Sequence, residues 1–155
     1  MLPLYVVNNY GQFNHLILRA LRDLDIDAKL IPNTTPVSEV REGCQGIILG
    51  GGPDISRAGL SHEYVRLGKP VLGICLGLHV IAQEFGGTVQ SGQKGGYGAV
   101  EVTITDHDGI LQGYPETMQV WHPMPMRSSP FLVILTGLQP LQYVATKPSD
   151  RKSVV

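Results

Sequence analysis

The chain has 155 residues, with 12 Lys and Arg, 13 Asp and Glu, and a formal net charge of −1. This length suits one globular domain, and the near-neutral charge removes the electrostatic reason to expect nucleic acid or an anionic membrane as a partner. No apolar run reaches the roughly 18 residues of a membrane-spanning helix, and the two cysteines suggest neither a disulfide framework nor a zinc site. We therefore expect a soluble, cytoplasmic α/β domain without bound metal.

Apolar strands alternate with helical segments through the first half of the chain. Short, mostly apolar runs predict buried strands at residues 4–7, 28–31, 46–49 and 71–74. A helix over 13–24 has one apolar face, formed by Phe13, Leu16, Ile17, Ala20, Leu21 and Leu24. Thr35 before Pro36 is typical of the start of a helix, with Thr35 as its N-cap. A short helix is predicted over 60–67, and another over 76–85, which Gly86-Gly87 ends. The alternation predicts a mostly parallel sheet with helices on both faces.

The later part of the chain follows a different pattern. Residues 100–104 alternate between apolar and polar, which predicts an antiparallel strand paired with 118–121. Residues 1–121 carry a net charge of −4, whereas 122–155 carry +3 and only one of the 19 glycines. Within this stretch, 131–135 is apolar enough for a buried strand. We divide the chain into a domain over 1–121 and an atypical tail over 122–155, for which a Pro-rich terminal extension is the simplest interpretation.

The chemistry of the chain centres on Cys75, in Gly73-Ile74-Cys75-Leu76-Gly77. A side chain between a buried strand and a helix is presented at the carboxyl edge of the sheet, and the helix N-terminus favours the thiolate. The Leu76 N–H points toward where an oxyanion would form, and Gly51 or Gly52 offers a second donor. We predict that Cys75 is a nucleophile. The alternative, a small buried core residue, is our interpretation of Cys44.

These segments resemble the class I (triad-type) glutamine amidotransferases. The likeness lies in the cysteine motif and in Gly51-Gly52-Pro53; Asn9-Tyr10-Gly11-Gln12-Phe13 resembles, more narrowly, the separate amidotransferase subunits of archaeal-type GMP synthases. The resemblance implies a flavodoxin-like fold and hydrolysis of glutamine to glutamate and ammonia through a Cys75 thioester. It implies no cofactor in this chain, and a partner synthetase subunit that uses ATP and magnesium to convert XMP to GMP with that ammonia.

The sequence departs from the family pattern at two places. Leu78-His79 stands where the family has His-Gln, and the Gln position helps to hold the substrate, so we assign His79 to substrate binding. A helix residue with only local hydrogen bonds is the alternative for His79. The family's His-x-Glu pair, which supplies the base, has no counterpart, because none of the five histidines has a carboxylate two residues later.

A single-base frameshift would explain both the missing base and the atypical tail. The family continues with Trp-x-Ser-His-x-Asp-x-Val. Codons chosen for this pattern, read one base out of frame after the Trp codon, translate as Trp-His-Pro-Met-Pro-Met-Arg-Ser, which is identical to residues 121–128. We hypothesise that the chain from His122 onward is out of frame, which leaves the C-terminal part of the fold incomplete.

Two further functional classes stay open. The chain could be a catalytically inactive homologue that only docks on a synthetase or regulates it. A peptidase or deglycase with a cysteine at the same turn is less favoured, because that group usually has His directly after the nucleophile, where this chain has Leu76.

Overall fold

The computed structural model describes residues 1–87, 89, 98–104, 107, 111–122, 132–135 and 142–144. The chain forms two compact units, Met1–Val89 with Leu132–Gln142, and Gln90–Phe131 with Tyr143–Val155. These units are defined by which parts of the chain pack together, and they do not test the predicted domain boundary at residue 121, which stays a prediction. Among the described residues, no helix has both the length and the apolar character that crossing a bilayer requires.

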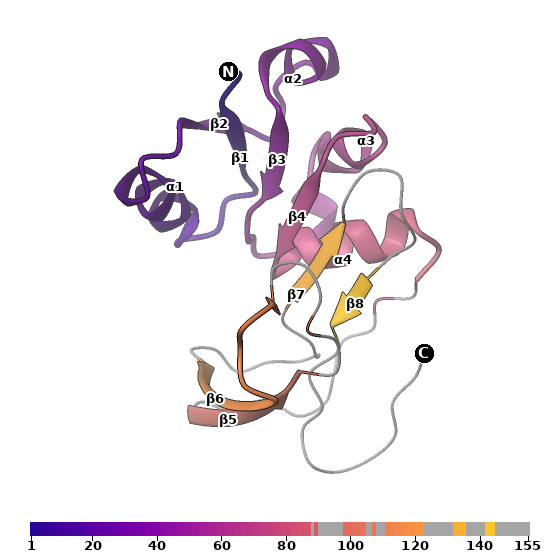
Figure 1. Ribbon diagram of the computed structural model, residues 1–155. Coiled ribbons are helices and arrows are strands. Elements are labelled where there is room, and N and C mark those ends of the chain that lie inside the picture. The colour runs from indigo at the N-terminus through magenta and orange to yellow at the C-terminus, as the bar shows by residue number, and fades with distance from the viewer. Residues whose placement is uncertain are drawn as a thin grey trace. The chain divides into compact units, whose positions relative to one another are not determined.

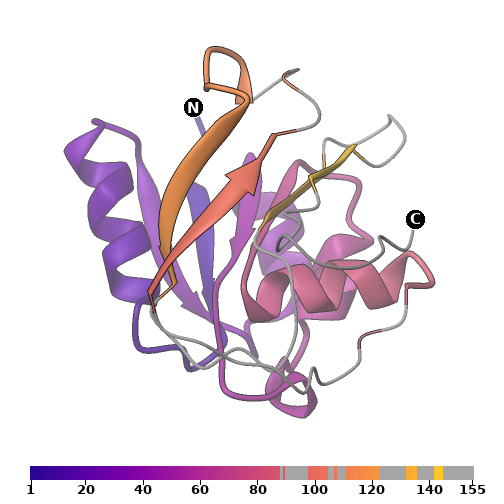
Figure 2. The same ribbon diagram turned by 90° about the horizontal axis from the view of Figure 1, so that it is seen from below.

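The first unit is built on parallel strands (Figures 1 and 2). β1 (Leu4–Asn8), β2 (Ala28–Pro32), β3 (Gly46–Leu49) and β4 (Val71–Ile74) lie in the order β2-β1-β3-β4. All four predicted strands are therefore confirmed, as is the α/β class with a mostly parallel sheet. Because parallel strands end at the same edge, the residues that follow β1, β3 and β4 are brought together there.

Helices cover both faces of this sheet. α1 (Asn14–Asp23) connects β1 to β2, whereas α2 (Val37–Gly43) and α3 (Ser61–Val65) lie on connections that run in the opposite direction across the sheet. Right-handed crossovers therefore place α1 on one face and α2 and α3 on the other. α4 (Leu76–Glu84) packs against α3 and β4, and a short 3₁₀ helix, η1 (Ile55–Arg57), precedes α3. The buried core lies between the sheet and the α2–α4 layer, and its largest fully buried side chains include Tyr64, Ile47, Leu49, Ile81 and Val7.

The capping role predicted for Thr35 is wrong. Pro36 directly precedes α2, and no side chain caps that helix. The Thr35 hydroxyl instead donates to the Pro32 carbonyl at 2.8 Å, and the Thr35 carbonyl accepts from the buried Tyr64 hydroxyl at 2.6 Å. Burial raises the pKa of Tyr64 to about 12, so this hydroxyl stays protonated and remains a donor. Thr35 thus joins the β2–α2 turn to α3.

The inward face of α1 also differs from the predicted one. The residues turned inward are Asn14, which is buried, and Ile17, Leu18 and Leu21, which are half-buried; Leu16 and Phe13 are exposed. Apolar periodicity assigns a polar residue to solvent, but Asn14 has hydrogen-bond partners at the carboxyl edge of the sheet. Satisfying this amide turns the helix so that positions 14, 17, 18 and 21 face inward.

The later strands are partly as predicted. β5 (Gly98–Thr103) pairs antiparallel with β6 (Thr117–His122), with Val102 opposite Met118, which confirms that predicted pair. The predicted strand within 131–135 is observed as β7 (Leu132–Leu135), antiparallel to β4, and β8 (Gln142–Val144) follows it in the sheet. The tail after residue 121 therefore supplies an apolar strand beside β4, whose edge would otherwise be open.

Candidate functional site

Cys75 occupies the turn between β4 and α4. Ile74 ends the strand and Leu76 begins the helix, so Cys75 alone makes the change of direction. Its backbone has φ +56° and ψ −108°, a conformation that residues other than glycine rarely adopt, and the residue is exposed. The turn therefore places the thiol at the carboxyl edge of the sheet with access to solvent.

Two glycines allow α4 to begin so close to the sheet. A Cβ atom on Gly77 would meet the Leu49 carbonyl oxygen and lie 2.6 Å from Leu49 Cβ, while one on Gly73 would lie 2.7 Å from the Gly77 carbonyl carbon. Real Cβ atoms do not approach neighbours so closely. The spacing Gly-x-Cys-x-Gly is thus required by packing on both sides of the turn.

Because Cys75 has a positive φ, replacing it with glycine, which has no Cβ, is predicted to stabilise the folded chain. We expect Cys75→Gly to have a free energy of unfolding about 1 kcal/mol higher than Cys75→Ala, because alanine keeps the Cβ that disfavours this backbone conformation. Urea denaturation followed by circular dichroism measures the difference, with Cys75→Ala as the matched thiol-free control. Equal unfolding midpoints would show that the turn carries no strain.

The three residues after β3, Gly50, Gly51 and Gly52, form a loop (the glycine loop) that lies against this turn. A Cβ built on Gly51 would lie 3.7 Å from Cys75 Cβ, and one built on Gly52 would lie 2.6 Å from Leu76 Cδ2. The structure thus brings together the four residues that the sequence analysis assigns to nucleophile and oxyanion site, namely Gly51, Gly52, Cys75 and Leu76. At this edge, a glycine-rich loop and the first residue of a helix lie beside one exposed thiol, so their peptide N–H groups are the candidates to stabilise a tetrahedral oxyanion.

Two buried residues that support this loop were not assigned a role by the sequence analysis. Asn9, which directly follows β1, is 0% exposed, and Asn14, the first residue of α1, is 2% exposed. The side-chain amide of Asn9 donates to the Gly50 carbonyl and that of Asn14 to the Gly51 carbonyl. Two signals could have identified Asn9: it directly follows a strand, in a chain whose strands end at one edge, and it belongs to the segment 9–13 that carries the narrower family resemblance.

His79 lies one turn of α4 beyond the cysteine. Its backbone N–H donates to the Cys75 carbonyl at 3.4 Å, and its side chain is half-buried. Burial lowers the pKa of His79, so its imidazole is neutral at pH 7 and offers one N–H donor and one acceptor nitrogen. The contact with substrate assigned to this residue stays a prediction.

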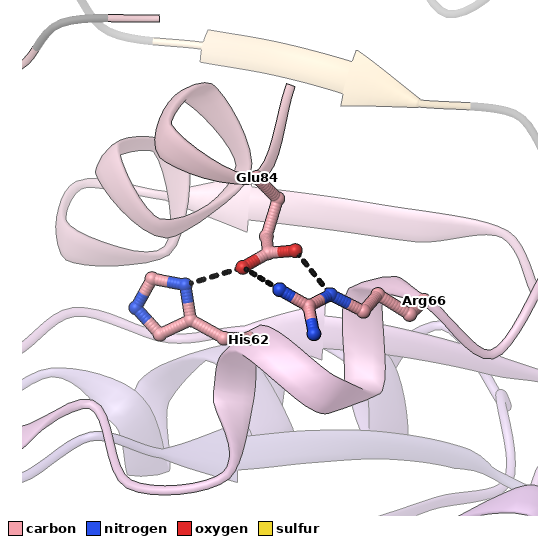
Figure 3. A network of polar contacts seen from close by, with 3 residues as sticks. All are labelled: His62, Arg66 and Glu84. Carbon is pink, nitrogen blue, oxygen red and sulfur yellow. Dashed lines mark hydrogen bonds and ion pairs between the residues drawn. The ribbon is translucent and has the colours of Figure 1, made fainter. Parts of the chain in front are cut away.

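A histidine–carboxylate pair does exist, but at the other end of α4 (Figure 3). His62 Nδ1 lies 2.9 Å from Glu84 Oε1, and Arg66 donates to the same carboxylate from Nε at 2.6 Å. The hydrogen bond from Arg66, and to a lesser extent that from His62, holds the pKa of Glu84 below its usual range. Glu84 lies nine residues after Cys75, about 13 Å along the helix, so this pair joins α3 to α4 and cannot serve the thiol as a base.

Three histidines remain. His15, on α1, and His107 are exposed, and His122 ends β6, with its side chain outside the described residues. Within the parts of the chain that the structure describes, no three His, Cys, Asp or Glu side chains gather as metal ligands. Cys44 is buried and its thiol donates to the Val40 carbonyl, as its interpretation as a core residue predicts.

Known sequences resemble the chain over most of its length. The profile of the family described as Glutamine amidotransferase class-I matches residues 5–125. A Methanospirillum hungatei protein, named as one subunit of glutamine-hydrolyzing GMP synthase, is 99% identical over 121 residues, which are 78% of this chain and 64% of that protein. A Methanoregula boonei protein of the same name is 70% identical over 121 residues, which are 78% of this chain and 66% of that protein. The chain thus spans about two thirds of the length of these curated relatives.

Solved structures share its fold. A Thermoplasma acidophilum protein provisionally described as one subunit of GMP synthase has a TM-score of 0.76 and 31% identity, over 96% of this chain and 74% of that one. A glutamine amidotransferase of Thermotoga maritima, 17% identical, has a TM-score of 0.62 over 88% of this chain and 72% of that one. These two likenesses agree with the flavodoxin-like arrangement that the sequence predicts.

Proposed function

Since this chain belongs to the class I glutamine amidotransferase family, we propose that it descends from, and in its intact form is, the amidotransferase subunit of a two-subunit GMP synthase. The observation that carries the proposal is the exposed Cys75 at a positive-φ turn, with Gly51, Gly52 and the first residue of α4 beside it. This arrangement suits acyl transfer to a thiol.

In the reaction that we propose, the Cys75 thiolate attacks the side-chain carboxamide carbon of glutamine. The carbon–sulfur bond forms as the carbonyl electron pair moves onto oxygen, and the N–H groups of Leu76 and of Gly51 or Gly52 stabilise that oxyanion. Collapse of the intermediate expels the amide nitrogen, which takes a proton and leaves as ammonia. Water then hydrolyses the thioester to glutamate. The half-buried, neutral His79 is our candidate for a hydrogen bond to the substrate.

The acceptor of the ammonia belongs to a partner chain in this proposal. The relatives are named as a subunit of GMP synthase, and we infer a synthetase subunit that holds ATP and magnesium and converts XMP to GMP. We place the reaction in the cytoplasm, the compartment that the sequence predicts.

We further propose that the chain is out of frame from His122 onward. Near-identity to the Methanospirillum hungatei protein covers 121 of the 155 residues, and about a third of that protein has no counterpart here. An out-of-frame tail would lack the histidine and carboxylate that activate the thiol, so this chain should hydrolyse glutamine poorly although Cys75 remains reactive.

A glutamine-like electrophile tests the proposed site without requiring turnover. We expect 6-diazo-5-oxo-L-norleucine to modify Cys75, as intact mass and peptide mapping would report, and L-glutamine to slow the reaction where D-glutamine does not. Cys75→Ala is the control that must remain unmodified. Modification at equal rates with and without L-glutamine would contradict a glutamine site. Ammonia release with added synthetase, ATP and XMP then separates an active enzyme from a partner that only docks.

A further inference from the structure

The glycine loop is held from behind by side-chain amides. Asn14 Nδ2 donates to the Gly51 carbonyl at 3.0 Å, and the Gly11 N–H donates to the same oxygen at 2.9 Å. Asn9 Nδ2 donates to the Gly50 carbonyl at 3.1 Å. Two consecutive carbonyls of the loop are thus anchored, both by residues that are almost fully buried.

An anchored carbonyl also determines where the next N–H points. No peptide bond between described residues is cis, and in a trans peptide the C=O and the following N–H point in opposite directions. Anchoring the Gly50 carbonyl therefore directs the Gly51 N–H away from Asn9, and anchoring the Gly51 carbonyl directs the Gly52 N–H away from Asn14. Among the described residues, the backbone hydrogen bonds include none donated by either N–H.

Without these hydrogen bonds the peptide units of the glycine loop could flip. Glycine has no Cβ to oppose rotation, so a Gly-Gly peptide can flip and present its carbonyl oxygen where its N–H should be. An oxygen facing Cys75 would repel an oxyanion instead of stabilising it. The loop therefore needs the closeness that glycine permits and an external constraint on its orientation.

The asparagines are themselves fixed. Asn9 Oδ1 accepts from Asn33 Nδ2 at 3.1 Å and from Ser61 Oγ at 2.9 Å, so its Nδ2 must face the loop. Asn14 Nδ2 donates also to Asn8 Oδ1 at 2.8 Å, which fills its second donor position. Each amide has one orientation that satisfies its neighbours, which makes the constraint on the loop a rigid one.

We infer that Asn9 and Asn14 are positioning residues. Asn9 holds the Gly50–Gly51 peptide and Asn14 holds the Gly51–Gly52 peptide, so that the N–H groups of these peptides serve the oxyanion formed at Cys75. The inference rests on the proposed function, in which Cys75 is acylated. It assigns these two asparagines a chemical role beyond stabilising the fold.

A pair of thiol reagents separates the two roles. 4-Nitrophenyl acetate acylates a thiolate through a tetrahedral oxyanion: the carbon–sulfur bond forms, the electron pair moves onto the carbonyl oxygen, and its return expels 4-nitrophenolate. Iodoacetamide alkylates the same thiolate by displacing iodide at a saturated carbon, and no oxyanion forms. The ratio of acylation rate to alkylation rate at Cys75 therefore reports on the oxyanion site, while thiolate fraction and access cancel.

We expect Asn14→Ala to lower this ratio by about tenfold, less than the loss of a donor itself, because the Gly11 N–H still holds the Gly51 carbonyl. The matched control is Tyr64→Phe, which removes another buried donor to a backbone carbonyl, that of Thr35, and should leave the ratio unchanged. Asn14→Asp, nearly identical in shape, is the second variant should alanine prevent folding. Its carboxyl can donate only when protonated, so the ratio should fall at neutral pH and recover as the pH is lowered.

The outcomes distinguish the inference from the proposed function. A burst of 4-nitrophenolate that Cys75→Ala abolishes is expected for the unmodified chain, and its absence would overturn both. A normal burst with the same ratio in Asn14→Ala, Asn14→Asp and Tyr64→Phe would overturn the positioning role alone.

Discussion

Restoring the reading frame after Trp121 is expected to raise the rate of glutamine hydrolysis by about a thousandfold or more. The thiol of Cys75 is exposed, and among the described residues the histidine that is hydrogen-bonded to a carboxylate is His62, at the far end of α4. Members of a nucleophile–base–carboxylate set act as a unit, and losing the base removes most of the rate that the set provides. The measurement is ammonia release by the repaired and unrepaired chains, each with the synthetase subunit.

The coding DNA around Trp121 provides the independent check. A frame that encodes a His-x-Glu segment downstream supports the repair, and the repaired chain carrying Cys75→Ala should return to background. If no alternative frame contains such a segment, the tail is genuine and the frameshift hypothesis is wrong. Equal rates for the repaired and unrepaired chains would instead show that the missing segment is not what limits hydrolysis.

Gly77→Val is expected to lower the free energy of unfolding by about 3 kcal/mol or more. A Cβ at this position would overlap the Leu49 carbonyl and lie 2.6 Å from Leu49 Cβ, and neither backbone can move without separating α4 from β3. Overpacking at a contact between a helix and a central strand leaves no flexible side chain to adjust. The alkylation rate of Cys75 should change as well, because the turn begins two residues earlier.

The matched control places the same side chain elsewhere on α4. Gln83 is exposed, so Gln83→Val changes only the intrinsic helix propensity, by less than about 1 kcal/mol. Urea denaturation of both variants measures the difference. A free energy for Gly77→Val within about 1 kcal/mol of that for Gln83→Val would mean that the turn tolerates a side chain there.

Local patterns predicted the elements well. The four apolar strands, the helix after Cys75 and the β5–β6 pair follow from runs and alternation that act over a few residues. The close spacing of glycines around Cys75 likewise predicted a tight turn, and the Cβ contacts of Gly73 and Gly77 give the reason. The predicted inward face of α1 is wrong, because apolar periodicity places the polar Asn14 on the surface, whereas its hydrogen bonds to Asn8 and Gly51 turn it inward.

The sequence by itself determined the α/β class, the order of its elements and the choice of Cys75 as the candidate nucleophile, since each depends on neighbours along the chain. It also predicted that Gly51 or Gly52 lies near Cys75 and Leu76, which the structure shows, but only the tertiary structure decided that Asn9 and Asn14 hold the loop carbonyls. Those contacts join residues up to 41 positions apart, as between Asn9 and Gly50. Hydrogen bonds of this kind depend on where parallel strands end in space, which no local periodicity encodes.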